Sequence, residues 1–241
     1  MSAINKNFSS GAAKYDNVAY IQPLVAARLA AKIDGGPRRI LEIGCGTGAL
    51  SLHLAKIFPD AELILTDISL PMLEICKAKL NGRGKFIIMD GERPDTTIGQ
   101  FDLITSSLAM QWFKDLPRSL CQLKDLLRPG GKFVFATLGK DSFKEWRMLL
   151  KKYNLSSGLH HYPDLLTFPW PSGSTSRMEE EFLTENHSSG TAFLKTLKAI
   201  GAATPRSGYK PLPTGALKTA LLDTRGGFIV TYHILYGFIE A

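Results

Sequence analysis

The 241-residue chain contains few cysteines, no long hydrophobic run and no excess of acidic residues. Its three cysteines, Cys45, Cys76 and Cys121, are odd in number and lack Cys-x-x-Cys spacing, which argues against a disulfide framework and against a zinc site. No apolar run approaches the roughly 18–20 residues that cross a bilayer. The first residues, MSAINKNFSSGAAKYDN, lack the apolar stretch of a secretory signal. We therefore expect a cytoplasmic protein with no membrane contact and no bound metal.

Positive charge is in modest excess, with 29 Lys+Arg against 22 Asp+Glu and a net charge of +7. Such a balance favours acidic partners, which include nucleic acid, an anionic membrane or an acidic protein. Basic residues occur at most two in a row, and no nucleic-acid-binding motif is present, so a nucleic-acid partner has no support. A hydrophobic content of 44% is typical of an ordinary globular chain with a sizeable core.

Strand-like and helix-like segments alternate through the first two thirds of the chain. Strands are predicted at 40–44, 62–67, 85–90, 101–106 and 132–138. Helices are predicted at 49–58, 70–80, 117–127, 142–153, 192–200 and 215–222, followed by a final strand at 227–239. Pro129-Gly130-Gly131 is expected to end one helix and to turn the chain into the strand that follows. Buried strands joined by crossover helices indicate an α/β fold with a parallel, doubly wound sheet.

The most informative segment is Glu42-Ile43-Gly44-Cys45-Gly46-Thr47-Gly48, between a predicted strand and a predicted helix. Its glycines let the backbone approach a ligand and adopt positive φ angles. A dinucleotide-binding turn would read G-x-G-x-x-G, whereas this one reads E-x-G-x-G-x-G. An acid near the turn suits a cationic ligand better than a pyrophosphate. The segment resembles motif I of the class I S-adenosylmethionine (SAM) methyltransferases, whose ligand carries an amino-acid end and a sulfonium.

Two acidic residues at other strand ends agree with this interpretation, because ligands of doubly wound sheets bind at the carboxyl ends of the strands. Asp67, 19 residues after Gly48, can accept hydrogen bonds from both ribose hydroxyls. Asp90 follows the third strand, where an acid can meet the adenine amino group, and Ile68 would pack on the base. The SAM-binding residues are therefore predicted to be Gln22, Glu42, Gly44, Cys45, Gly46, Gly48, Asp67, Ile68, Met72, Asp90, Gly91 and Ser106.

Further segments are similar to the malonyl-acyl-carrier-protein O-methyltransferases of biotin synthesis. They are AAKYDNVAYIQP (12–23), SSLAMQWFKDLPRSL (106–120), FATLGKDSFKEWR (135–147), LKAIGA (197–202) and TYHILYGFI (231–239). The resemblance implies a Rossmann-like, mostly parallel seven-stranded sheet. It also implies an enzyme that uses SAM to esterify the free carboxylate of a malonyl thioester. The partner would be acyl carrier protein carrying a malonyl group, or malonyl-coenzyme A.

We expect four parts along the chain: an N-terminal lid (1–35), a SAM-binding core (36–154), an inserted lid (155–215) and a helix and strand that complete the core (216–241). The segment at 155–185 is rich in Pro, Ser and Gly, with little periodicity. It also carries aromatic residues, which suit a cover over a ligand.

Under this resemblance no general base is needed, because a carboxylate with a pKa near 4 is already ionised at neutral pH. Positioning and exclusion of water would carry catalysis. Arg147 is expected to hold the substrate carboxylate, with Gln111 and Trp112 beside it and Tyr15 closing over SAM. The five histidines are expected to be structural. Carrier protein would dock on basic residues of the inserted lid, namely Arg177, Lys195, Lys198, Arg206 and Lys210.

Two other hypotheses remain open. One is another SAM-dependent methyltransferase, acting on the carboxylate or amine of a small molecule without a carrier protein. The other is a methyltransferase-like factor related to the assembly proteins of respiratory complex I, which share the signature at 106–120. That hypothesis predicts SAM binding without turnover of malonyl thioesters, together with a stable protein complex. Neither the choice between carrier protein and coenzyme A nor the oligomeric state follows from the residues.

Overall fold

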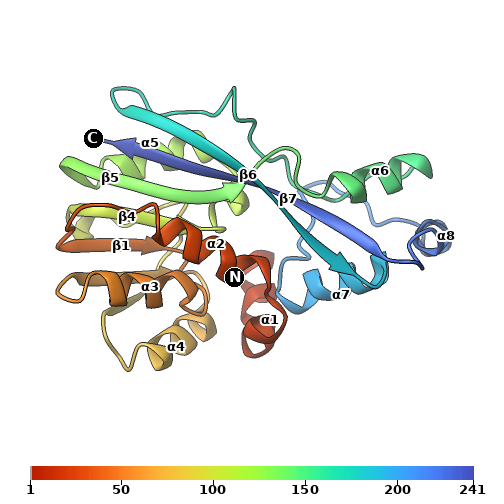
Figure 1. Ribbon diagram of the computed structural model, residues 1–241, viewed down its shortest axis with the longest axis horizontal. Coiled ribbons are helices and arrows are strands. Elements are labelled where there is room, and N and C mark those ends of the chain that lie inside the picture. Colours follow the sequence, from red (N-terminus) through yellow and green to blue (C-terminus); the bar gives the residue numbers. More distant parts are fainter. Residues whose placement is uncertain (1) are drawn as a thin grey trace.

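A single seven-stranded sheet runs through the molecule, with helices on both faces (Figure 1). The computed structural model describes residues 2–241. The strands are β1 (Arg39–Ile43), β2 (Glu62–Asp67), β3 (Lys85–Ile88), β4 (Phe101–Ser107), β5 (Leu127–Leu138), β6 (Thr175–His187) and β7 (Phe228–Glu240). The α-helices are α1 (Ala3–Val18), α2 (Ile21–Ala30), α3 (Ala49–Ile57), α4 (Leu70–Lys79), α5 (Leu116–Lys124), α6 (Lys144–Lys152), α7 (Gly190–Ala199) and α8 (Thr214–Leu222). Two 3₁₀ turns, η1 and η2, lie at Thr96–Ile98 and Met110–Trp112.

The strand order is β3-β2-β1-β4-β5-β7-β6. The first five strands in this order pair in parallel, whereas β7 is antiparallel to both β5 and β6. The chain winds outward from β1 to β3 and then returns to β4, so the direction of winding reverses between β1 and β4. This arrangement confirms the expected doubly wound, mostly parallel α/β fold. A ligand site is expected at the carboxyl ends of β1 and β4, where the winding reverses.

Hydrophobic cores lie on both faces of the sheet. On one face α2, α3, α6 and α7 pack over a core that includes Val25, Leu54 and Phe193, all fully buried. On the other face α5 covers a core that includes Leu41 and Phe133, which are also fully buried. Burying one such side chain contributes about 1.5–3 kcal/mol. Burial on both faces explains why the parallel strands are recognisable as short apolar runs.

Most predicted elements are observed with shifts of a few residues, but the start of β5 differs from the prediction. The strand begins at Leu127 rather than 132, so Pro129-Gly130-Gly131 lies inside it and the helix predicted to reach 127 ends at Lys124. The register against β4 shifts between Phe101 and Leu103, which accommodates the irregular segment. Gly130 has a φ angle of 73°, and its N–H donates to the carbonyl of Ala241 at 3.0 Å.

The strand β6 corrects the prediction of a lid at 155–215. It is 13 residues long and pairs with β7 from Thr175 opposite Glu240 to His187 opposite Phe228. Leu183 is the one buried residue of β6, and four of the other positions are glutamates, Glu179, Glu180, Glu181 and Glu185. A charged edge strand of this kind resists edge-to-edge pairing but carries little hydrophobic signal. In Figure 1, β6 and β7 together cross the whole length of the molecule and reach the end formed by α6, α7 and α8.

The segment at 1–35, predicted to be a lid, divides into two parts. α2 packs against α3, and its Val25 and Leu29 are fully buried, so α2 belongs to the helical layer of the core. α1 lies between α4 and the end of α7 (Figure 1). Its backbone approaches the loop after α7 so closely that a Cβ on Gly201 would lie 2.8 Å from the carbonyl oxygen of Asn7. Of the segment 1–35, α1 is thus the helix that lies outside this layer.

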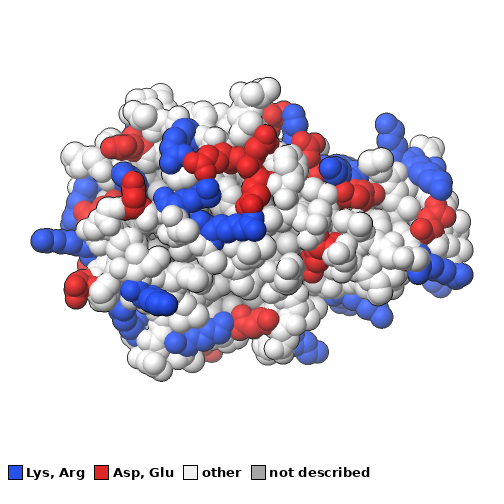
Figure 2. Space-filling view, viewed as in Figure 1, with Lys and Arg blue, Asp and Glu red and all other residues white. Residues whose placement is uncertain are grey.

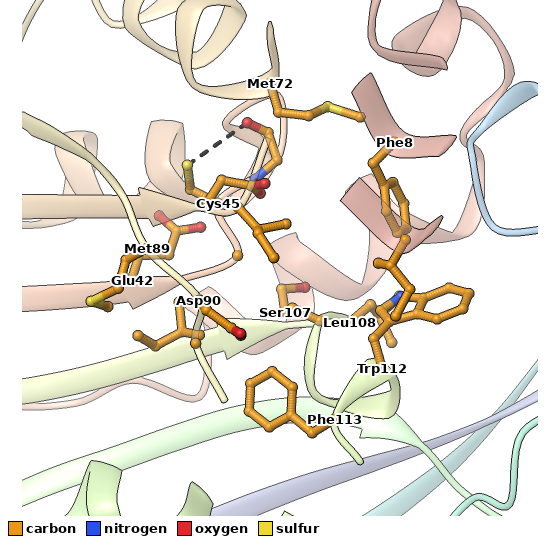
Figure 3. A pocket seen from close by; sticks show the side chains of 18 of the residues that line it. Phe8, Glu42, Cys45, Met72, Met89, Asp90, Ser107, Leu108, Trp112 and Phe113 are labelled. Carbon is orange, nitrogen blue, oxygen red and sulfur yellow. Dashed lines mark hydrogen bonds between the residues drawn. The ribbon is translucent and has the colours of Figure 1, made fainter. Parts of the chain in front are cut away.

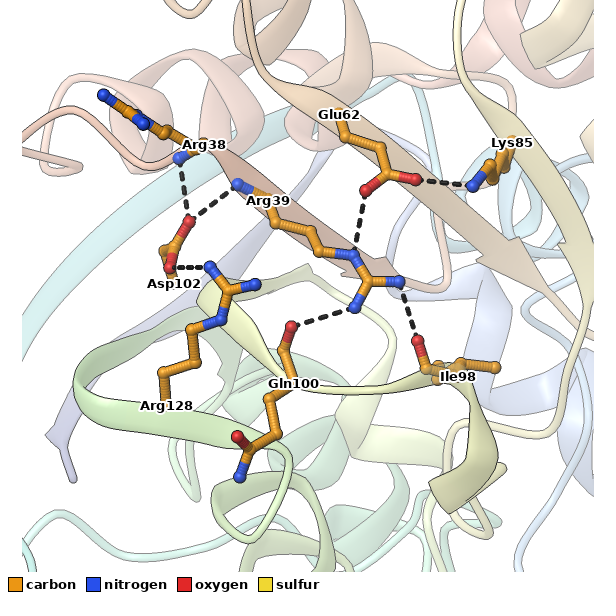
Figure 4. Close-up of polar contacts among 8 residues, drawn as sticks. All are labelled: Arg38, Arg39, Glu62, Lys85, Ile98, Gln100, Asp102 and Arg128. Carbon is orange, nitrogen blue, oxygen red and sulfur yellow. Dashed lines mark hydrogen bonds and ion pairs between the residues drawn. The ribbon is translucent and has the colours of Figure 1, made fainter.

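The amino ends of the parallel strands are joined by a network of charged groups (Figure 4). Arg39 of β1 donates through Nε to Glu62 of β2 at 2.9 Å, and Lys85 of β3 contacts the same carboxylate at 2.6 Å. Asp102 of β4 accepts the backbone N–H of Arg39 at 2.8 Å and the guanidinium of Arg128 at 2.6 Å. Every carboxylate oxygen of this network is therefore occupied by a donor of the chain itself.

Candidate active site

The glycine turn after β1 has the geometry that its spacing predicts. Gly44, Gly46 and Gly48 have φ angles of 70°, 54° and 91°, in the left-handed region that favours glycine. A Cβ on Gly44 would also lie 2.4 Å from the Cβ of Ala109. The turn leads directly into α3, whose first N–H groups lack partners within the helix and lie beside the turn.

Two carboxylates flank this turn. Glu42 is buried and accepts a hydrogen bond from the hydroxyl of Ser51 at 2.6 Å, and burial raises its pKa to about 8. Asp67, at the end of β2, accepts the backbone N–H groups of Gly46 at 2.9 Å and Ser69 at 2.8 Å. Burial raises the pKa of Asp67, although these backbone donors oppose the rise. Asp67 thus fixes the glycine turn against the neighbouring strand.

A cavity of about 280 Å³ opens beside the turn, at the carboxyl ends of β1, β2, β3 and β4 (Figure 3). Ten of the residues predicted to bind SAM line it, namely Gln22, Glu42, Gly44, Cys45, Gly46, Asp67, Ile68, Met72, Asp90 and Gly91. Phe8 and Trp112 lie against each other on one side of the cavity, and Met89 and Asp90 lie on another (Figure 3).

Two residues of the predicted set do not line this cavity. Gly48 faces α4, where a Cβ would lie 2.9 Å from the sulfur of Cys76, so its small size serves packing. Ser106 is fully buried and donates to the carbonyl of Ile43 at 2.9 Å. Its neighbour Ser107 lines the cavity instead, because successive residues of a strand face opposite sides.

Other lining residues were missed by sequence reasoning, notably Phe8, Met89, Leu108 and Phe113. Phe8 lies on α1, a few residues before the recognised segment 12–23, and the other three lie in loops after β3 and β4. Nothing in the local pattern distinguishes such an apolar residue from one that only packs.

A second cavity, of about 380 Å³, adjoins the first. The two cavities share the lining residues Phe8, Tyr15, Gln22, Leu108 and Trp112. The remaining wall is mainly apolar and comes from the end of β5, from α6, α7, α8 and β7, and from the loops near 160 and 205. Its apolar side chains include Leu138, Phe143, Trp146, Leu159, Leu194, Leu197, Ile200, Leu212 and Leu217.

Trp112 is the central residue of the shared wall. Its ring packs edge-on against Phe8, with 5.5 Å between ring centroids, and against His160, with 5.1 Å. Tyr15 is also part of this wall. Burial and the nearby charges of Asp67 and Asp16 raise the pKa of its hydroxyl, so the phenol stays neutral. The shared wall therefore offers a neutral donor and two aromatic faces to a group that bridges the cavities.

Of the four residues predicted to position the substrate, Tyr15, Gln111 and Trp112 line the second cavity and Arg147 does not. The inward-facing residue of α6 is Trp146, and the next residue on a helix points about 100° away. The guanidinium of Arg147 donates instead to the carbonyl of Lys140. Its charge still opposes the rise in the pKa of the buried Tyr162 hydroxyl. His160, which we expected to be structural, lines the cavity.

The residues predicted to dock the carrier protein lie in two different parts of the structure. Arg177 lies on β6, away from both cavities, where it contacts Glu179 and stacks on Phe238 with its guanidinium carbon 3.5 Å from the ring centroid. The other four, Lys195, Lys198, Arg206 and Lys210, lie on α7 and the loop that follows it. Within residues 2–241 no cluster of His, Cys, Asp and Glu is arranged to hold a metal ion, and no helix is long and apolar enough to cross a membrane.

The profile of a family described as methyltransferase domain matches residues 41–135. The chain is 43% identical to malonyl-[acyl-carrier protein] O-methyltransferase of Magnetococcus marinus, over 98% of this chain and 91% of that protein. It is 41% identical to the biotin biosynthesis bifunctional protein BioCD of Bordetella avium, over 98% of this chain and 51% of that protein. It is also 32% identical to malonyl-[acyl-carrier protein] O-methyltransferase 1 of Ilyobacter polytropus, over 98% of this chain and 93% of that protein.

Solved structures with similar folds share much less sequence. The YcgJ protein of Bacillus subtilis superimposes with a TM-score of 0.60 at 15% identity, over 90% of this chain and 97% of that one. The plantazolicin methyltransferase BpumL, in complex with S-adenosylhomocysteine and a substrate analogue, gives a TM-score of 0.52 at 18% identity, over 99% and 95% of the two chains. These two likenesses concern the fold alone.

Proposed function

The chain belongs to the malonyl-[acyl-carrier protein] O-methyltransferases, and we propose that it esterifies the free carboxylate of a malonyl thioester with a methyl group from SAM, as a step of biotin synthesis. The observation that carries this proposal is the pair of adjoining cavities, one lined by the glycine turn and by carboxylates, the other without a carboxylate and mainly apolar, with Trp112 in the wall between them. Such a pair accommodates a methyl donor and an acyl chain side by side. Identity of 43% across nearly the whole chain supports the same conclusion.

The cofactor is SAM, and the residues of the first cavity fit it. When bound, it supplies an electrophilic methyl group on a sulfonium. We propose that the carboxylate of Asp67 accepts the ribose hydroxyls through lone pairs that its two backbone donors leave free. Asp90 would accept the adenine amino group. Glu42 would face the cationic amino-acid end across the glycine turn, and Met72 and Ile68 would contact the base.

The protein's part in the reaction is to position and to exclude water. The substrate carboxylate is ionised at neutral pH, so an oxygen–carbon bond forms while the carbon–sulfur bond breaks and its electron pair stays on sulfur. No proton moves, which agrees with a shared wall that holds the neutral phenol of Tyr15. The rings of Phe8 and Trp112 would exclude water from the line of transfer, where a carboxylate stripped of water approaches a cation most readily.

Arg147 is proposed to act on the substrate site without contacting the substrate. Its guanidinium holds the carbonyl of Lys140 and lies close enough to Tyr162 for its charge to act on that hydroxyl. We propose that it raises the positive potential behind the wall of the second cavity. Replacement by alanine would then weaken binding of the malonyl group less than loss of a direct ligand would.

The carrier protein is proposed to dock over the second cavity. Residues 188–227 contain six basic side chains and one acidic one, a net charge of +5 out of +7 for the chain. On α7, Leu194 and Leu197 line the cavity while Lys195 and Lys198 are exposed. Within residues 2–241 none of the six basic side chains has a carboxylate within 4.0 Å. Basic side chains project from this end of the molecule in Figure 2.

The test is transfer of labelled methyl from SAM to malonyl-acyl carrier protein, with malonyl-coenzyme A and acetyl-acyl carrier protein as comparison substrates. We expect a methyl ester on the malonyl carrier and none on the acetyl carrier. Trp112→Ala should reduce the rate strongly, and Trp170→Ala, outside both cavities, is its matched control. SAM binding without transfer to any malonyl thioester would refute the proposal and favour a methyltransferase-like assembly factor.

A further inference from the structure

The second cavity lacks a permanent cation, although the proposed substrate is an anion. Among the described residues that line it there is no lysine and no arginine. There is no aspartate or glutamate either, so the wall does not repel an anion. The lining side chains that can form hydrogen bonds are Tyr15, Gln22, Gln111, Trp112, Trp146, His160, Tyr162, Thr204, Tyr209 and Tyr232. Only the histidine of this set can carry a positive charge.

His160 lies at the end of the cavity nearest the methyl donor. Its ring centroid is 5.1 Å from that of Trp112, which also lines the SAM cavity. Its Nε2 is 3.0 Å from the carbonyl oxygen of Thr204. A carbonyl oxygen can only accept, so Nε2 carries the hydrogen and donates it. This bond fixes the orientation of the ring.

The other ring nitrogen, Nδ1, is left for a ligand. It has no hydrogen-bond partner within residues 2–241, and it is not among the polar atoms that are fully buried without one. In the neutral ring Nδ1 accepts a hydrogen bond, and in the imidazolium it donates one. A carboxylate at this position favours the imidazolium, because an opposite charge at hydrogen-bond distance stabilises the charged form.

The charged groups near His160 are cations, which attract an anionic substrate although they do not themselves favour a charged ring. The charge of Arg147 on α6 acts on the hydroxyl of Tyr162, which lines the cavity. The backbone N–H of Arg206 donates to the carbonyl of Gly158, another lining residue, at 2.9 Å. On the side of η2 the ring packs against the neutral Trp112, which in turn packs against Phe8 of α1. Glu185 on β6 accepts the hydroxyl of Tyr232, another lining residue, at 2.9 Å. Within residues 2–241 the ion pairs of histidine involve only His187 and His233, so no carboxylate of these residues lies within 4.0 Å of the His160 ring nitrogens.

We propose that His160 is the residue that binds the free carboxylate of the malonyl group, as an imidazolium donating from Nδ1 to one carboxylate oxygen. The other oxygen faces the SAM cavity past Trp112 and is the one that becomes methylated. Methylation removes the negative charge, and the imidazolium then holds an ester with no charge to pair with, so the product is released. Acetyl thioesters carry no free carboxylate for His160 to bind, so they are rejected.

The inference rests on the proposed function, and the experiment separates the two. Wild type, His160→Gln and the control His161→Gln are compared with malonyl-acyl carrier protein from pH 6 to 9. Glutamine preserves a donor to the Thr204 carbonyl but not the charge, and His161 is exposed outside the cavity. SAM affinity, measured by calorimetry, and the melting temperature report on the cofactor site and on folding.

We expect His160→Gln to raise KM for malonyl carrier by about tenfold or more, as loss of a charge-assisted hydrogen bond does. SAM affinity should stay within about twofold. The KM of wild type and of His161→Gln should rise with pH as histidine loses its proton, while the malonyl carboxylate stays ionised throughout. The KM of His160→Gln should be independent of pH.

An unchanged KM in His160→Gln, or a pH dependence that the variant retains, would overturn the inference and leave the methyltransferase assignment intact. The same holds if Arg147→Gln abolishes discrimination against acetyl carrier while His160→Gln preserves it, because the charge would then come from Arg147. Failure of the wild type to methylate any malonyl thioester would instead refute the proposed function.

Discussion

The two ends of the parallel sheet treat polar groups in opposite ways. At the amino ends, Arg39, Glu62, Lys85 and Asp102 bind one another and nearby carbonyls across β1 to β4 (Figure 4). At the carboxyl ends, carboxylates and a histidine line two cavities, and part of their hydrogen-bonding capacity has no partner in the chain. The same residue types therefore stabilise the fold where the chain supplies their hydrogen-bond partners, and they are available to a ligand where it does not.

The contributions of these charged groups to stability also differ between the two ends of the sheet. Exposed ion pairs such as Lys85–Glu62 contribute at most about 1 kcal/mol each. Buried carboxylates such as Glu42 cost stability when they are charged, and that cost is recovered only when a cation arrives. Substitutions at the two ends should therefore separate stability from binding.

The largest contrast is expected between two glycines with nearly the same backbone. Gly44 and Gly130 have φ angles of 70° and 73°, so alanine strains both, by about 1–2 kcal/mol. A Cβ at 44 would lie 2.4 Å from the Cβ of Ala109, whereas a Cβ at 130 meets nothing within 4 Å. By calorimetry Gly44→Ala should lower SAM affinity more than about 100-fold, and Gly130→Ala should leave it unchanged. Equal affinities in the two variants would contradict the role of the turn.

Next in size is a pair of aspartates, one from each end. Asp67→Asn should weaken SAM binding by about 10- to 100-fold, because charge-assisted hydrogen bonds to the ribose would be lost. Asp102→Asn should leave SAM affinity unchanged and lower the free energy of unfolding by about 1–2 kcal/mol, since two backbone donors and Arg128 lose a charged acceptor. Urea denaturation and calorimetry measure both quantities. Loss of binding in Asp102→Asn would show that the ends are coupled.

A third contrast concerns pH. Glu42 in the free protein holds its proton up to about pH 8, whereas a bound cation favours the carboxylate, so binding releases a proton below that pH. SAM affinity should rise with pH between about 6 and 8, by at most tenfold per unit, and then level off. Glu42→Gln should abolish the rise. Glu62→Gln is the control, because Lys85 and Arg39 already hold the pKa of Glu62 low. A rise that persists in Glu42→Gln would exclude Glu42 as its source.

The same group affects the stability of the free protein in the opposite direction. The unfolded chain releases the Glu42 proton near the ordinary value of 4.5 and the folded protein near 8, so the unfolded state binds fewer protons between these values. The contribution of Glu42 to stability is therefore lost as the pH rises through that window. Glu42→Gln should flatten this part of the stability profile measured by urea denaturation.

The smallest effect is expected at the surface over the second cavity. Lys195→Glu with Lys198→Glu should raise KM for malonyl-acyl carrier protein a few-fold at low salt, and less at high salt, because exposed charges are screened. KM for malonyl-coenzyme A should change less. Lys56→Glu, on the exposed face of α3 and outside both cavities, is the control. A similar rise for Lys56→Glu would indicate a general charge effect and no docking site.

The sequence predicts the SAM side of the molecule much better than the substrate side. Glu42, the glycine turn and Asp67 belong to short segments in which spacing along a strand or turn determines position, so their convergence follows from the parallel topology. Gly48 belongs to the turn but faces α4 rather than the cavity, and the serine that lines the cavity is Ser107 rather than its neighbour Ser106. Within a short segment, errors of this kind stay small.

The substrate side depends on contacts between distant segments. Leu183 is the only buried residue of β6, so its pairing with β7 leaves almost no hydropathy pattern to detect. The rotation of α6 that points Trp146 inward and Arg147 outward is set by packing against β7. His160 lies in an irregular loop that is ordered by the carbonyl of Thr204, 44 positions away. No local pattern contains this information.

The position of α1 carries a thermodynamic consequence. This helix forms part of the wall of both cavities through Phe8 and Tyr15, and it is held at both sides, by Asn5 on the carbonyl of Ile68 and by Asn7 on Thr204. A ligand that shifts the helix on one side alters the shape of the chamber on the other. Linkage then requires reciprocity: by whatever factor the methyl donor changes the affinity for the acyl group, the acyl group changes the affinity for the donor. One helix thus makes the occupancy of each cavity a function of the concentration of both ligands.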